Sequence, residues 1–167
     1  LIEKGTYLKG KRHGVCFWYY KNGNIDTKAH FEHGVENGII THYFKSGELQ
    51  DSGIFVNGKQ TGIAFTFYKD GNIDREQEWQ NGSQNGYFKS YYQDGSKKMI
   101  AEIKNDTTTY YIEYDSLGNA IDEYSDCSVC DTSDFENYNP KIIISNRDYL
   151  IIDSLETIKL NVENVPN

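Results

Sequence analysis

Glycine recurs every 24 residues along this chain, in three separate registers. The three series are Gly14, Gly38, Gly62 and Gly86; Gly23, Gly47, Gly71 and Gly95; and Gly10, Gly34, Gly58 and Gly82. A fixed period of this length is the signature of a repeat protein, in which each unit is one small supersecondary motif. The spacing predicts four full repeats between two partial ones.

Each repeat holds two stretches rich in aromatic and β-branched residues, joined by a short turn written KNG, KSG, KDG or QDG. The first stretches cover residues 15–20, 39–44, 63–68 and 87–92, and the second cover 25–31, 49–55, 73–79 and 97–103. Such runs, bounded by glycine turns, predict β-hairpins. The expected fold class is therefore all-β, with one antiparallel sheet that grows by two strands, or about 9–10 Å, per repeat.

The KNG turn decides which side chains share a face of this sheet. A two-residue turn would pair Tyr20 with Ile25 and mix apolar and charged residues on both faces. A three-residue loop, a type I turn followed by a left-handed Gly23, pairs Tyr19 with Ile25 instead. We predict the second arrangement, because it alone yields one consistently apolar side. The residues expected on that side are Val15, Phe17, Tyr19, Ile25, Thr27, Ala29 and Phe31.

The 24-residue phrase, with an aromatic residue followed by x-N-G, resembles the MORN repeat over about residues 5–121. It is most similar to a bacterial variant found in proteins described as antitoxins of toxin–antitoxin pairs. The resemblance implies an elongated, twisted antiparallel sheet of stacked hairpins. It assigns structural roles to the aromatic positions Tyr20, Phe44, Tyr68 and Tyr92, and to the turn glycines Gly23, Gly47, Gly71 and Gly95.

The last unit departs from the repeat pattern. Asp106 stands where a glycine is expected, three threonines at 107–109 replace the usual polar turn, and Gly118 comes one residue early. These departures predict that the repeat changes into a cap at this end.

Charge is distributed unevenly along the chain, whose net charge is −8. Residues 1–106 carry 14 Lys and Arg against 13 Asp and Glu, whereas residues 107–167 carry 3 against 12. A near-neutral repeat region offers no basic stripe for a phosphate backbone, so we expect no nucleic-acid partner. No stretch approaches the roughly 18–20 continuous apolar residues of a membrane span, so we expect no membrane insertion.

The sequence predicts three regions: MORN-like hairpin repeats at 1–124, an acidic linker at 125–140, and a short C-terminal β segment at 141–167. Within the last region, residues 141–144, 149–152 and 157–162 predict three short strands. So small a segment rarely folds alone. It either covers or extends the repeat sheet, which has an apolar face to bury, or opens a truncated β-sandwich domain; we favour the second reading.

Few residues suggest chemistry. Cys127 and Cys130 form a CxxC pair without further zinc ligands nearby, so we predict a loop pair that forms a local disulfide if the protein is exported. Cys16 is expected to be a small strand residue, and the four histidines are expected at the surface, although His30 and His33 could meet at a hairpin end. We predict no metal, no cofactor and no enzyme activity, because no catalytic constellation is present.

The recurring aromatic residues have two readings. They either stabilise the sheet through cross-strand contacts, or present a contact surface to a partner. The candidate interaction face comprises Trp18, Tyr20, His42, Phe44, Tyr68 and Tyr92.

Together these features predict a non-catalytic repeat scaffold for protein–protein interaction. Two alternatives are an antitoxin-like module that neutralises a partner toxin and a surface module that binds glycans or the cell envelope. The tyrosine- and asparagine-rich strands and the opening without methionine favour an exported or cell-envelope protein over a cytoplasmic one.

Overall fold

The computed structural model describes residues 2–125, 141–145 and 148–152 of the 167-residue chain, and its architecture there is all-β. The chain divides into two units, residues 1–130 and 131–167. The predicted linker residues 126–140, the cysteines Cys127 and Cys130, and the strand expected at 157–162 lie outside the described residues.

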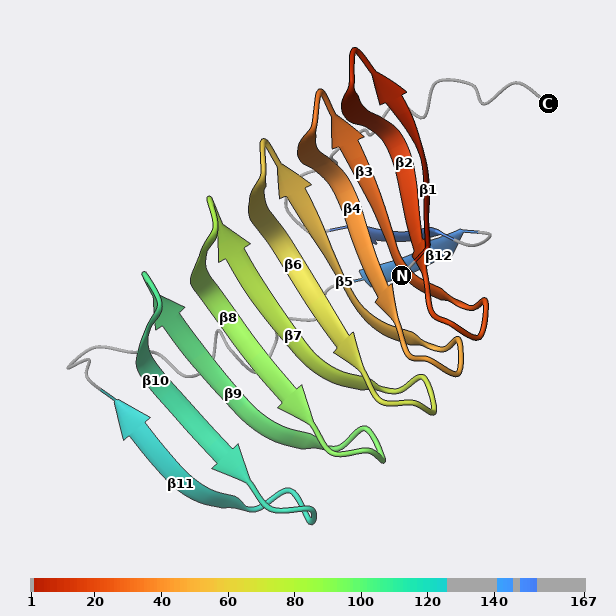
Figure 1. Ribbon diagram of the computed structural model, residues 1–167. Helices are drawn as coiled ribbons and strands as arrows, with labels where there is room; N and C mark the ends of the chain where they lie inside the picture. Colours follow the sequence, from red (N-terminus) through yellow and green to blue (C-terminus); the bar gives the residue numbers. More distant parts are fainter. Residues whose placement is uncertain (1, 126–140, 146–147, 153–167) are drawn as a thin grey trace. The chain divides into compact units, whose positions relative to one another are not determined.

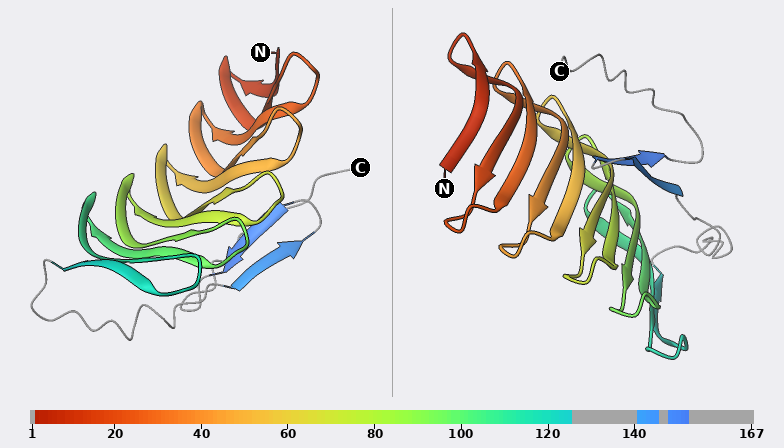
Figure 2. Two further views of the ribbon diagram at one scale, coloured as in Figure 1. Left: turned by 90° about the horizontal axis from the view of Figure 1, so that it is seen from below. Right: turned by 90° about the vertical axis from the view of Figure 1, so that its right-hand side faces the viewer.

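Eleven antiparallel strands form one open sheet in the first unit, and each strand is hydrogen-bonded to its neighbours in sequence (Figure 1). They are β1 (Ile2–Leu8), β2 (Lys11–Tyr19), β3 (Ile25–Glu32), β4 (Val35–Tyr43), β5 (Leu49–Val56), β6 (Lys59–Phe67), β7 (Ile73–Gln80), β8 (Ser83–Tyr91), β9 (Lys97–Lys104), β10 (Thr107–Tyr114) and β11 (Ala120–Ser125). The predicted stack of hairpin repeats is confirmed, and Figure 2 shows the strongly bent strands following one another. In the second unit, β12 (Lys141–Ser145) and β13 (Asp148–Ile152) form a separate hairpin.

The turns after β2, β4, β6, β8 and β10 have the predicted three-residue form. The Gly23 amide donates to the Tyr20 carbonyl at 3.0 Å, and the Tyr20 amide donates to the Asn24 carbonyl at 2.8 Å. Gly23 has a φ of 89°, a left-handed conformation that glycine adopts without the penalty of a Cβ. The same bonds recur at Gly47, Gly71 and Gly95, so the 24-residue period of the sequence is the spacing between these turns.

A bulge directly after the turn overturns the predicted apolar face. Tyr19 does lie opposite Ile25, but Trp18 lies opposite Thr27, so Asp26 is an extra residue without a partner. A shift of one residue exchanges the two faces of a strand. Val15 and Phe17 therefore lie on the side away from Ala29 and Phe31, and the predicted grouping of these residues is wrong. The same bulge occurs at Gln50, Asp74 and Lys98.

Both faces of the sheet bury apolar side chains, so the expectation of a single apolar side is also wrong. We call the side that carries Cys16, Trp18, Ala29 and Phe31 the Cys16 face, and the opposite side the Phe17 face. The Cys16 face buries Cys16, Ala29, Phe31, Ile40, Ala64, Ala101 and Ile103, and the Phe17 face buries Ile63, Phe65, Ile100 and Tyr110. Val15, which was expected in the core, is 38% exposed.

The turns at the other end of the hairpins contain two residues. His33 and Gly34 both have positive φ, 51° and 89°, and Glu32 pairs directly with Val35. This is the type I′ geometry, which favours Asn-Gly. Asp106 takes the glycine position of the last such turn with a φ of 63°, and its carboxylate accepts a hydrogen bond from the Gln84 amide at 2.7 Å. The turn therefore survives the loss of its glycine.

The irregular last repeat has a structural cause. β10 has eight residues, whereas β2, β4, β6 and β8 have nine each. The bulge between β9 and β10 contains one extra residue of β10, between Thr108 and Tyr110. The corresponding bulge between β7 and β8 contains two extra residues of β8. This missing residue is why Gly118 comes one step early, and it places Tyr111 on the Cys16 face, opposite Ala101.

Candidate interaction surfaces

Three of the four recurring aromatic residues Tyr20, Phe44, Tyr68 and Tyr92, which we call the aromatic ladder, join consecutive repeats. The hydroxyl groups of Tyr20, Tyr68 and Tyr92 donate to the backbone carbonyls of Tyr43, Tyr91 and Tyr114, at 2.7, 2.8 and 2.9 Å. Each bond links a turn to the repeat that follows it. Phe44 occupies the same position in the second repeat without a hydroxyl, and the ammonium group of Lys69 lies 5.6 Å from its ring centre.

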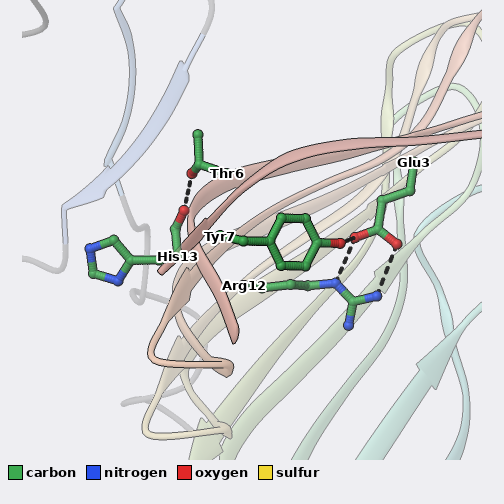
Figure 3. Close-up of polar contacts among 5 residues, drawn as sticks. All are labelled: Glu3, Thr6, Tyr7, Arg12 and His13. Carbon is green, nitrogen blue, oxygen red and sulfur yellow. Dashed lines mark hydrogen bonds and ion pairs between the residues drawn. The ribbon is translucent and has the colours of Figure 1, made fainter. Parts of the chain in front are cut away.

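Trp18 lies in a polar and aromatic cluster at the N-terminal end of the Cys16 face. Its ring is 6.0 Å from that of Phe31 in an edge-on arrangement, and the Arg12 guanidinium lies 5.3 Å from its centre. Glu3 accepts both the Nε and an Nη of Arg12, at 2.7 and 2.9 Å, and also the Tyr7 hydroxyl at 2.5 Å (Figure 3). The Arg12 guanidinium lowers the pKa of the Glu3 carboxyl to about 2.

His42 lies in the same cross-strand row as Trp18, with Thr27 between them. Its Nδ1 donates to the carboxylate of Asp51, its partner on β5, at 2.5 Å. This hydrogen bond raises the pKa of His42. The structure thus brings Trp18 and His42 onto one face, whereas the four ladder residues lie beyond the strand ends, at the turns.

The remaining histidines do not meet as the sequence suggested. His33 lies near His13, with ring centres 5.3 Å apart, while His30 contacts the carbonyl of Asn37 through Nδ1 at 2.5 Å. Among the residues that the structure describes, no group of three or more His, Cys, Asp and Glu side chains could hold a metal ion.

Two charged side chains are buried in the middle of the Phe17 face. Glu76 and Lys89 lie directly opposite each other on β7 and β8, and Glu76 accepts the Tyr91 hydroxyl at 2.8 Å. Burial lowers the pKa of Lys89 and raises that of Tyr91. The cation opposite this buried carboxylate and the hydroxyl that donates to it compensate the cost of burying its charge. Such pairing is usual for buried charged groups and indicates a structural role.

A groove of about 580 Å³ lies on the Cys16 face over β7–β11, and sequence reasoning missed it. Its lining residues are Gln77, Gln84, Phe88, Met99, Ala101, Ile103, Thr108, Tyr111 and Tyr124. Four of these, Phe88, Ala101, Tyr111 and Tyr124, follow one another in a single cross-strand row. Ala101 is 3% exposed and lies between two large aromatic side chains, so the small residue forms the floor and its neighbours the walls.

The amino-acid pattern of that row explains why the groove is confined to one end. Over β1–β7 the row reads Gly5, Cys16, Ala29, Ile40, Gly53, Ala64 and Gln77, and aromatic side chains begin with Phe88. The sequence contains this change from non-aromatic to aromatic residues. It could have revealed the groove if the bulges had been recognised, because they decide which residues share the row.

The chain is a repeat protein built from stacked β-hairpins, and this class agrees with the sequence comparison. The MORN repeat variant family matches residues 12–33 and 60–81. MORN repeats are commonly non-catalytic modules that bind proteins or membrane lipids, and they are generally not enzymes. Comparison with curated proteins gave no match.

The matched repeats carry no information on toxins, so the antitoxin alternative stays a prediction. Among the described residues, no helix is long and apolar enough to cross a membrane.

Proposed function

We propose that this protein is a non-catalytic interaction module that binds a partner protein in the groove over β7–β11. The observation that carries the proposal is the groove itself, an open hollow with aromatic and aliphatic walls on a sheet that has one layer. Its volume falls within the 300–1,000 Å³ typical of binding pockets. Tyr124, at the outer wall, is 44% exposed, and clustered exposed aromatic residues are typical of contact surfaces.

The groove is suited to contact rather than to acid–base chemistry. Its polar lining consists of the amides of Gln77 and Gln84 and the hydroxyl of Thr108, together with the tyrosine hydroxyls. The buried charged pair of Glu76 and Lys89 lies on the Phe17 face, opposite the groove. Amides and hydroxyls can orient a bound segment by hydrogen bonds, while the aromatic walls supply most of the buried area.

Site-specific photo-crosslinking of the full chain tests this proposal. A photoreactive phenylalanine analogue replaces Tyr124 in the groove or, as a control, Val56, an exposed residue on the Phe17 face. We expect a partner protein to be captured from position 124 and not from position 56. Capture from position 56 alone would contradict the proposal, and so would catalytic turnover by the purified chain that Tyr124→Ala abolishes.

A further inference from the structure

An acidic pair lies at one end of the groove. Glu113 on β10 and Asp122 on β11 are directly opposite each other, one row from the opposed pair Tyr111 and Tyr124. Residues two apart on a strand share a face, so both carboxylates lie on the Cys16 face. Glu113 is also opposite Met99, which lines the groove. The two carboxylates therefore continue the groove wall.

This pair is not neutralised within the part of the chain that the structure describes. Like charges directly opposite each other in an antiparallel pair destabilise a sheet. The Tyr111 hydroxyl donates to Asp122 at 2.7 Å, but no described Lys or Arg forms an ion pair with Glu113 or Asp122. From residue 105 to residue 125 the sequence holds five acidic residues and no basic one. A bound cation would relieve this repulsion.

We infer that the groove binds a partner segment in which apolar side chains are followed by Lys or Arg, and that Glu113 and Asp122 hold the basic end. This inference rests on the proposed function and adds the chemistry of the partner. The apolar side chains lie against Phe88, Ala101 and Tyr111, and the basic end lies over β10 and β11.

Charge also decides against other occupants of the groove. A second copy of this chain would bring together two proteins that each carry such an acidic end and a net charge of −8. An anionic lipid surface or a nucleic acid would meet the same carboxylates. Like-charge contacts of this kind suppress the wrong partner, and opposite charge favours the cationic one.

Fluorescence anisotropy with designed peptides tests the inference on the full chain. The probes share one apolar core of five residues and carry two lysines, two serines or two glutamates at each end. Each exposed ion pair contributes up to about 1 kcal/mol, and 1.4 kcal/mol corresponds to a factor of ten. We therefore expect the lysine-flanked peptide to bind about tenfold more tightly than the glutamate-flanked one at low salt, with the difference shrinking at high salt.

Two variants on the same strand form the matched comparison. Asp122→Lys should abolish the preference for lysine flanks, whereas Glu123→Lys, one residue along and on the Phe17 face, should preserve it. Tyr124→Ala should weaken every peptide by removing one wall. Should Asp122→Lys fail to fold by circular dichroism, Asp122→Asn keeps the shape of the side chain and should reduce the preference by about half.

Four results would overturn the inference. Equal affinity for all three flanks would leave the groove as a contact site without charge selection, and the proposed function would stand. If Asp122→Lys and Glu123→Lys reduced the preference for lysine-flanked peptides equally, that preference would depend on the overall charge of the chain and not on the position of Asp122. Absence of binding by every peptide would also reject it, while the crosslinking experiment judges the proposed function separately. Dimers in analytical ultracentrifugation that Tyr124→Ala dissociates would identify a second copy as the occupant.

Discussion

The aromatic ladder makes it possible to measure how much the hydrogen bonds between neighbouring repeats contribute to the free energy of unfolding. Replacing Tyr68 by Phe removes one hydroxyl that donates to the Tyr91 carbonyl at 2.8 Å and leaves the ring in place. The second repeat already has this composition, because Phe44 stands at the equivalent position. Phe44→Tyr is therefore the reciprocal change, adding a hydroxyl where the other repeats have one.

The size of the effect follows from the partly buried position of these bonds. A hydrogen bond of this kind contributes about 1 kcal/mol net to the free energy of unfolding. The three bonds of Tyr20, Tyr68 and Tyr92 involve separate carbonyls, so their effects should add to about 3 kcal/mol. At about 2.1 cal/mol/K of unfolding entropy per residue, a sheet of this length loses about 4 °C in Tm per kcal/mol.

Urea unfolding and calorimetry of the full chain measure these changes. We expect each single Tyr→Phe substitution to lower Tm by about 4 °C, the triple variant by about 12 °C, and Phe44→Tyr to raise it by a few degrees. Tyr124→Phe is the control, because that tyrosine is exposed and should leave Tm unchanged. A triple variant as stable as the native chain would show that water replaces these bonds and would refute the reasoning.

Two further predictions concern His42 and the turn glycines. The pKa of His42 is raised in the folded state by Asp51, so its stabilising contribution is fully present below the unfolded pKa of about 6.5 and is lost as pH rises through the folded value. Urea unfolding between pH 5 and pH 9 should show this loss in the native chain and not in Asp51→Asn. Gly71→Ala should destabilise by about 1–2 kcal/mol, because φ is 92° while no atom lies within 4 Å of the added Cβ. Gly71→Asn should cost less, and equal melting curves for the Ala variant would contradict the argument.

The sequence was most informative about turns and least informative about faces. Each turn is a local feature, in which Gly23 or its equivalents supply a left-handed conformation that few other residues adopt. Asn105 and Asp106 mark a limit of this argument from glycine, because both adopt positive φ in a turn that has no glycine. The alternation of side chains, by contrast, depends on bulges whose extra residues, such as Asp26 and Asp74, carry no distinctive signal beyond their polarity.

The six residues of the predicted interaction face lie in two different places in the structure. Trp18 and His42 lie in one row of the Cys16 face. Tyr20 and its equivalents lie beyond the strand ends, and the hydroxyls of the three tyrosines among them are bonded to the next repeat. Whether these six residues contact a partner stays a prediction. The groove was not predicted, because it depends on the missing residue in β10, which turns Tyr111 toward Ala101.

The sequence by itself determined that this chain forms sequential hairpins in one antiparallel sheet, because glycine turns at a 24-residue spacing separate stretches rich in aromatic and β-branched residues. The tertiary structure decided which side chains share a face and where the sheet is hollow. The physical reason is that a hairpin is closed by hydrogen bonds between neighbours in sequence, whereas a groove arises from side chains on five successive strands whose relative positions change with every inserted or missing residue.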